Sequence, residues 1–182
     1  IFVVGLFDVA TCQNTDIFQI NTSGFALPFN ITDMAITPAG ELYFIISSIG
    51  TQYIAKLNTP ANTLSIVTVM PGNTNALVCD ANGVLWASGA LGLFSFNLST
   101  GIGTVHGPIN YLSSGDLTFR DGKLYGISFT NEIMEINIAN PDQSTVSFTY
   151  NAPPGIYAWG VVSSVESCDS TSTYITLTNG VL

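Results

Sequence analysis

Four aspartates recur along the chain at Asp33, Asp80, Asp116 and Asp121. Carboxylates gathered from several repeats can hold a metal ion or act as a general acid and base. Asp80 and Asp121, however, lie just before a glycine, where an aspartate typically accepts hydrogen bonds from its own turn. We expect Asp33 and Asp116 to begin strands, and either to cap them or to bridge neighbouring repeats. The calcium-loop pattern Asp-x-Asp-x-Asp-Gly does not occur. The pattern therefore predicts structural carboxylates, with no catalytic residue, no metal and no other cofactor.

Catalysis or metal binding by several histidines is excluded, because His106 is the single histidine of the chain. Triads and zinc sites both depend on histidine placed beside other polar groups. His106 precedes Gly107 and Pro108, so we expect it to lie in a turn. These observations predict that the protein is not an enzyme.

The three cysteines are Cys12, Cys79 and Cys168, and none has the spacing of metal ligands. Cys79 lies in an alternating apolar segment and is expected to be a small buried side chain. Cys12 and Cys168 sit in similar sequence contexts near the two ends of the chain. They form a disulfide only if their repeats are neighbours and their Cα atoms come within about 4.4–6.8 Å. We keep this bridge as a candidate.

Aromatic residues recur at Tyr43, Trp86 and Tyr125. Such rings suit either sugar stacking or packing between repeats, and one ring at the same place in each repeat favours packing. Trp159 breaks the pattern, because it follows the turn at Pro153, Pro154 and Gly155. It is the better candidate for an exposed aromatic that contacts a ligand.

A repeated strand positions these residues. Four alternating apolar segments end on an asparagine, at 17–21, 53–58, 93–97 and 133–137. Their spacings are 37, 39 and 40 residues. A period near 40 with several short strands per unit is typical of a β-propeller, in which each unit forms one blade.

Glycine turns supply a second marker of the repeat. Gly40, Gly83 and Gly122 each precede a leucine by two residues, and an aromatic follows that leucine. Such glycines supply the positive φ of tight hairpin turns. Candidate fourth strands are 64–70, 103–106 and 144–150. We therefore predict an all-β protein, a propeller of four-stranded antiparallel blades of about 39–40 residues.

The repeat divides a single domain, 1–182, into units of about 1–30, 31–72, 73–110, 111–154 and 155–182. Cys12 and Cys168 lie 156 residues apart, which is four times 39. The last unit looks unfinished, so we expect an incomplete propeller or a fragment of a longer protein.

Composition excludes several partners. Hydrophobic residues make up 47% of the chain and charged residues 8%, with three Lys and Arg against twelve Asp and Glu. The formal net charge of −9 cannot replace counterions along nucleic-acid phosphates, and it opposes an anionic membrane surface. No apolar run is long enough for a membrane-spanning helix, so we predict no membrane insertion.

Residues 36–43, 93–101 and 114–125 resemble propeller repeats of large secreted Bacteroidetes proteins. Those proteins commonly carry gliding-motility-associated or type IX secretion sorting domains at their C-termini. The resemblance covers about residues 8–182. It consists of the turn and strand residues of the repeat rather than active-site residues. It implies export through the outer membrane and an extracellular or cell-surface location.

Together these observations predict a non-enzymatic extracellular propeller that acts as a cell-surface adhesion or protein-interaction module. One alternative is a carbohydrate-binding or carbohydrate-active propeller that uses acidic residues and Trp159. Another is a structural or assembly subunit, whose open blade pairs its free strand edge with another chain or with missing sequence. The predicted partner is therefore a protein or a glycan at the cell surface.

Overall fold

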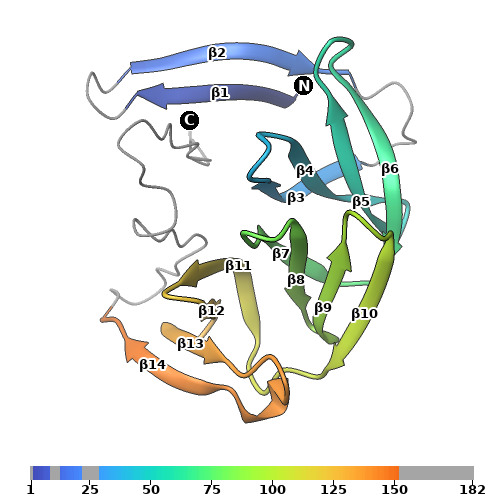
Figure 1. The fold of residues 1–182 in the computed structure, drawn as a ribbon. Coiled ribbons are helices and arrows are strands. Elements are labelled where there is room, and N and C mark those ends of the chain that lie inside the picture. Colours follow the sequence, from blue (N-terminus) through green and yellow to red (C-terminus); the bar gives the residue numbers. More distant parts are fainter. Residues whose placement is uncertain (1, 9–12, 22–28, 152–182) are drawn as a thin grey trace.

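The computed structural model of this chain describes residues 2–8, 13–21 and 29–151 (Figure 1). It describes side chains for residues 19–21 and 30–151. Cys12, Trp159 and Cys168 lie outside these residues. The candidate disulfide and the candidate ligand-contact tryptophan therefore stay predictions.

The described residues form three four-stranded antiparallel sheets and one two-stranded sheet. We name the four-stranded sheets blades 1, 2 and 3. Blade 1 contains β3 (Phe29–Ile36), β4 (Leu42–Ser48), β5 (Thr51–Asn58) and β6 (Thr63–Met70). Blade 2 contains β7 (Thr74–Cys79), β8 (Val84–Gly89), β9 (Gly92–Asn97) and β10 (Ile102–Gly107). Blade 3 contains β11 (Ser113–Arg120), β12 (Lys123–Ser128), β13 (Glu132–Ile136) and β14 (Thr145–Thr149). The two-stranded sheet pairs β1 (Phe2–Asp8) with β2 (Gln13–Ile20), and a 3-10 turn, η1 (Pro141–Gln143), precedes β14.

The glycine turns form as the sequence predicts. Gly40, Gly83 and Gly122 adopt φ values of 78°, 75° and 74°, a region that residues with a side chain rarely enter. The first hairpin of each blade then closes in matching register, since Ile36 pairs with Leu42, Cys79 with Leu85 and Phe119 with Leu124. The second strands therefore align from Leu42, Leu85 and Leu124 onward, whereas the turn of blade 3 is one residue shorter than the other two.

The repeated asparagines end or follow the third strand of a blade. Asn97 Oδ1 accepts hydrogen bonds from the N–H groups of Ser99 and Thr100, at 2.9 and 3.0 Å. Asn137 Oδ1 accepts in the same way from Ala139 and Asn140, at 3.1 and 3.0 Å. In blades 2 and 3 the asparagine side chain therefore holds the turn that follows the third strand, whereas in blade 1 Asn58 Nδ2 donates to Ser65 Oγ at 2.6 Å.

The blades stand around a common centre (Figure 1). The first strands β3, β7 and β11 lie innermost and contact one another, whereas the fourth strands β6, β10 and β14 lie at the periphery. This arrangement confirms the predicted all-β propeller architecture. The described part holds three complete blades and one two-stranded sheet, as expected for an incomplete propeller.

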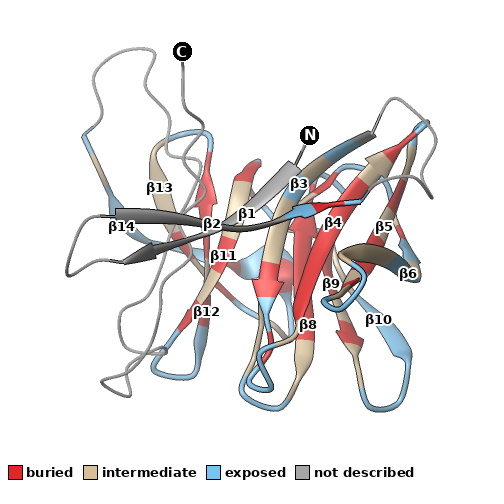
Figure 2. Cartoon of the chain, turned by 90° about the horizontal axis from the view of Figure 1, so that it is seen from above, coloured by how far each residue is buried: buried red, intermediate tan, exposed pale blue. Residues whose placement is uncertain are grey.

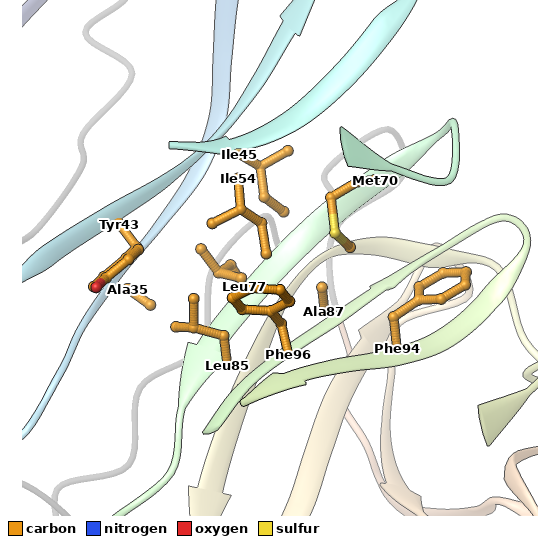
Figure 3. Close-up of a cluster of buried hydrophobic side chains, with 10 residues drawn as sticks. All are labelled: Ala35, Tyr43, Ile45, Ile54, Met70, Leu77, Leu85, Ala87, Phe94 and Phe96. Atoms are coloured by element: carbon orange, nitrogen blue, oxygen red, sulfur yellow. The ribbon is translucent and has the colours of Figure 1, made fainter. Parts of the chain in front are cut away.

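The hydrophobic core lies in the seams between neighbouring blades. Alternate residues of one strand face opposite seams, because successive side chains point to opposite faces of a sheet. In β4, Leu42 packs toward Ile20 of β2, and Tyr43 packs toward blade 2. Figure 3 shows the seam between blades 1 and 2, where Ile45 and Ile54 meet Leu77. The seam between blades 2 and 3 is formed by Ala76, Trp86, Leu93, Leu117, Phe119, Leu124 and Ile136.

The antiparallel order places the turns on two opposite faces of the propeller. The Gly-turn face carries the β3–β4, β7–β8 and β11–β12 turns, together with the β5–β6, β9–β10 and β13–β14 connections. The connection face carries the β4–β5, β8–β9 and β12–β13 turns and the segments that join one blade to the next. Figure 2 shows buried residues along the strands and exposed residues in many of the turns. Within the described residues, no helix has the length and apolar character needed to cross a membrane.

Candidate functional site

Asp33 lies on the innermost strand of blade 1 and bridges it to blade 2. Its Oδ1 accepts a hydrogen bond from the Met34 N–H at 2.7 Å, and its Oδ2 accepts one from the Leu77 N–H of β7 at 2.6 Å. The expectation that Asp33 bridges repeats is confirmed. The expectation that Asp33 and Asp116 begin strands is wrong, because each lies well inside its strand, β3 or β11. The Leu77 backbone N–H thus finds its acceptor in the Asp33 side chain of the neighbouring blade.

The electrostatics of Asp33 reflect its place near the propeller centre. Burial raises its pKa well above the usual range, and the nearby Asp116 carboxylate raises that pKa further. The two backbone donors oppose this shift without cancelling it. Asp116 Oδ1 accepts from the Leu117 N–H at 2.8 Å, as Asp33 Oδ1 does from Met34. The first and third blades therefore place equivalent carboxylates close enough to influence one another.

Blade 2 has Ala76 at the position of Asp33 and Asp116, so it contacts blade 3 through a different side chain. The preceding residue, Asn75, donates from Nδ2 to the Ser113 carbonyl of β11 at 3.2 Å. A Cβ on Gly115, which has a φ of 102°, would lie 2.9 Å from the Asn75 carbonyl oxygen. Glycine at 115 therefore allows this close approach between β7 and β11.

A glutamine that the sequence analysis did not single out joins blades 1 and 2. Gln52 of β5 donates from Nε2 to the Thr74 carbonyl at 2.9 Å and accepts from the Thr74 N–H at 2.6 Å. Both residues are buried. The side-chain amide thus pairs with the first residue of β7 as a neighbouring strand would. The sequence carries no local signal for this contact, because its partners are 22 residues apart.

Asp80 confirms its predicted role in a turn. Its Oδ1 accepts from the N–H groups of Asn82 and Val84, at 2.9 Å each. Its Oδ2 accepts from the Trp86 indole Nε1–H at 3.1 Å. The carboxylate therefore holds both the glycine turn and the aromatic residue that follows it.

The repeated aromatics pack in the seams, as predicted for Tyr43 and Trp86. Tyr43 lies in the core with Leu77 and Leu85, and Trp86 meets Phe119 edge to face with ring centroids 6.3 Å apart. Each repeated ring also donates to a carboxylate at the Gly-turn face. The partners are Glu41 for Tyr43, Asp80 for Trp86 and Glu135 for Tyr125. The polar edge of each ring is thereby satisfied within the fold.

Blades 1 and 3 carry one ion pair with its charges exchanged. In blade 1 Glu41 precedes β4 and pairs with Lys56 of β5. In blade 3 Lys123 takes the place of Glu41, and Glu135 takes the place of Lys56, with Nζ and Oε1 2.8 Å apart. The Lys56 ammonium lowers the pKa of Glu41, and the Glu41 carboxylate raises the pKa of Lys56.

His106 lies in β10, so the prediction of a turn residue is wrong. Its Nε2 is 2.8 Å from Ser95 Oγ, and its ring lies over Trp86 with centroids 4.9 Å apart. Burial lowers the pKa of His106, which keeps the imidazole neutral at pH 7. A serine–histidine pair needs a third group that orients the base. Among the described residues no carboxylate hydrogen-bonds to this imidazole, and we assign the pair to packing within blade 2.

The remaining candidate groups are also part of the fold. Cys79 is half-buried against the seam between blades 1 and 2, and burial with the nearby Asp80 raises its pKa to about 11. It is therefore a neutral thiol at pH 7. Within the part of the chain that the structure describes, no three or more His, Cys, Asp and Glu side chains gather as metal ligands would.

Four-stranded antiparallel blades around a common centre define a β-propeller protein, and comparison with solved structures agrees. The chain is similar to a structure in a nidogen/laminin complex, with a TM-score of 0.58 and 15% identity over 78% of this chain and 55% of the other. It is similar to a luciferin-regenerating enzyme, with a TM-score of 0.56 and 12% identity over 74% of this chain and 51% of the other. A third similar structure is the extracellular domain of a hybrid two-component system from B. thetaiotaomicron, with a TM-score of 0.54 and 14% identity over 75% and 19% of the two chains.

The chain thus spans about half, or less, of the length of these structures. At such low identity the likeness establishes the fold alone. No protein family model and no curated protein sequence matches the chain.

Proposed function

We propose that this chain is a non-enzymatic propeller module that binds other proteins outside the cell. One observation carries the proposal: the repeated chemical groups are used inside the fold. Asp33 joins two blades, Asp80 holds a turn, and the rings of Tyr43 and Trp86 are buried in seams. Groups committed in this way support the scaffold, so recognition is left to the turns that the scaffold displays.

Two similar structures support the proposal. One is an extracellular domain, which supports an extracellular setting, and the other comes from a complex of two proteins, which supports protein binding. The low fraction of charged residues and the resemblance to secreted Bacteroidetes repeats point the same way. Display at the cell surface, adhesion and export by a type IX route are parts of this proposal that rest on the resemblance.

The proposal is tested by presenting the purified chain to two arrays in parallel. One array carries extracellular proteins and the other carries glycans. We expect saturable binding to a small set of proteins and none to glycans. Binding restricted to glycans would replace this proposal with the carbohydrate-binding alternative. Turnover of an array compound would overturn the assignment as a non-enzyme.

A further inference from the structure

Blade 3 departs from the repeat in the connection between its third and fourth strands. Residues 59–62 make this connection in blade 1 and residues 98–101 make it in blade 2, whereas the longer segment 137–144 makes it in blade 3. The segment of blade 3 includes η1, and the two shorter connections contain no helix. Insertions specific to one repeat often lie on the face that a repeat protein uses for binding.

Hydrogen bonds hold this segment in one shape. The Ser144 hydroxyl is buried, donates to the Pro141 carbonyl at 2.8 Å and accepts from the Asn137 N–H at 3.1 Å. Asn137 Oδ1 accepts from two further N–H groups of the same segment. Asn110, which lies in the chain that enters blade 3, donates from Nδ2 to the Ser144 carbonyl at 2.8 Å. The segment is therefore ordered before a ligand arrives, which lowers the entropic cost of binding.

A cavity of about 370 Å³ lies between this segment and the adjacent ends of β12 and β13, at the Gly-turn face. Leu124, Ile136 and Ile138 give it apolar surface, and Gln143 and Thr145 give it an amide and a hydroxyl. Cavities of about 300–1,000 Å³ with mostly apolar walls and a few polar groups are typical of ligand sites. Blade 3 therefore has a site of suitable size where it departs from the repeat.

The polar side chains of this cavity are available to a ligand. Within residues 30–151, neither the Gln143 side-chain amide nor the Thr145 hydroxyl has a hydrogen-bond partner, and both residues are exposed. Gln52 shows what a glutamine amide binds in this fold, because it accepts from the N–H of Thr74 and donates to the carbonyl of the same residue. Gln143 can pair in this way with an extended residue of another chain.

The charges and rings around the cavity disfavour other classes of ligand. Lys123 and Glu135 line the cavity and neutralise each other, with Nζ and Oε1 2.8 Å apart, so they leave no net charge for a phosphate or a metal ion. The described residues that line the cavity include no aromatic ring on which a sugar could stack. A neutral peptide needs neither feature.

We propose that this cavity binds a short, uncharged peptide segment of a protein partner. One extended residue of the segment pairs with the Gln143 amide, a polar neighbour meets the Thr145 hydroxyl, and an aliphatic side chain lies against Ile138. This inference rests on the proposed function and names its binding site. Main-chain pairing supplies affinity in such complexes, and the pocket for the side chain supplies specificity.

A displayed library of random peptides, presented to the whole chain, tests this inference. Peptides selected on the wild type should carry no net charge. Their affinity should fall about fivefold or more in Gln143→Glu, which keeps the shape but replaces the amide donor with a carboxylate. Thr145→Phe, which a strand position tolerates, should block the cavity and abolish binding. Ser99→Ala, which removes an exposed hydroxyl from the equivalent connection of blade 2, should bind as the wild type does. Selection of charged peptides, or equal binding by all three variants, would overturn the inference.

Two measurements separate loss of the ligand from damage to the fold. The melting temperature of Gln143→Glu should stay within about 2 °C of the wild type, because exposed substitutions change stability little. In NMR spectra of the wild type, the side-chain NH₂ signals of Gln143 should shift when a selected peptide is added. Those of Gln52, which is buried and already paired with Thr74, should stay in place. Unchanged Gln143 signals would overturn the inference whatever the variants do.

The protein and glycan arrays and sedimentation equilibrium decide between the rivals. A glycan whose binding is lost in both Gln143→Glu and Thr145→Phe would assign the cavity to sugar instead. A dimer that is lost in Thr145→Phe would assign it to a second copy of the chain. If array proteins bind these variants as they bind the wild type, the proposed function stands and this location is wrong. If no array protein binds while peptides are still selected at the cavity, the proposed function fails and the peptide site stands.

Discussion

The seam between blades 1 and 2 and the seam between blades 2 and 3 both have apolar cores, but they differ in their polar connections. Between blades 1 and 2, the Asp33 carboxylate and the Gln52 amide bind backbone groups of β7. Between blades 2 and 3, the Asn75 amide makes one bond to a β11 carbonyl, and the hydroxyls of Ser88 and Ser113 lie 3.5 Å apart. Repeats that share one sequence pattern therefore have unequal seams, because single residues such as Ala76 depart from the pattern.

The largest expected loss of stability comes from truncating the apolar side chains of the seams. This loss should be similar in the two seams. Leu77 and Leu117 occupy equivalent positions and are 2% and 3% exposed. Leu77→Ala and Leu117→Ala should each lower the free energy of unfolding by about 2–5 kcal/mol, since each leaves a cavity. Urea denaturation measures both. A large difference between the two variants would show that the apolar packing also distinguishes the seams.

The next largest loss of stability should come from removing the polar side chains that connect the blades, and it should differ between the two seams. Asp33→Ala leaves the N–H groups of Leu77 and Met34 without their acceptor, and should cost about 1–3 kcal/mol. Asn75→Ala removes a single neutral bond to the Ser113 carbonyl and should cost about 0.5–1.5 kcal/mol. The same denaturation assay compares them, with Asp33→Asn as a control that keeps one acceptor oxygen. Equal losses would remove the distinction between the seams.

A dependence on pH sharpens the comparison, because the Asp33 carboxylate bridges β3 and β7 in the first seam. The pKa of Asp33 is raised on folding, so the folded state holds this proton more tightly than the unfolded chain does. Its contribution to stability is complete below the unfolded pKa of about 3.9, and it is lost as pH rises through the folded pKa. The stability of wild type relative to Asp33→Asn should therefore increase as pH falls from neutral toward about 4. A difference that stays flat over this range would contradict the raised pKa.

The smallest effect is expected outside the seams, at the exposed pair of Glu41 and Lys56. Lys56→Glu should lower stability by less than about 1 kcal/mol, since solvent and salt screen the pair. The double variant Glu41→Lys, Lys56→Glu restores opposite charges and should recover most of that loss. Thermal melts at low and high salt measure the recovery. A loss as large as that of Asp33→Ala would mean that the seams do not dominate stability.

Features determined by neighbouring residues could be predicted from the sequence. The turns at Gly40, Gly83 and Gly122 and the contacts of Asp80 depend on a few adjacent positions, and they followed the pattern. Strand ends were harder. The predicted fourth strand 103–106 included His106, whereas the adjacent Gly107 and Pro108 predicted a turn at this residue, and His106 lies in β10 where the pairing with β9 shifts register.

Contacts across seams could be predicted only in outline. Asp33 was expected to bridge repeats, but its acceptor role toward Leu77 depends on how two blades meet. Gln52 lies in an ordinary alternating strand, and nothing near it indicates that it binds Thr74. The φ of 46° at Ile49 was likewise unforeseen, because a β-branched residue is disfavoured at positive φ.

The exchanged ion pairs of blades 1 and 3 have a consequence for how the chain finds its fold. Blades of similar sequence can exchange strands during folding, and such mispairing is a hazard of repeat proteins. If β4 paired with β13 in the native register, Glu135 would lie opposite Tyr43, beside Glu41. If β12 paired with β5, Lys123 would meet Lys56 in the same way. Each wrong pairing would bring like charges together. The repulsion would disfavour exchange of these strands between blades 1 and 3.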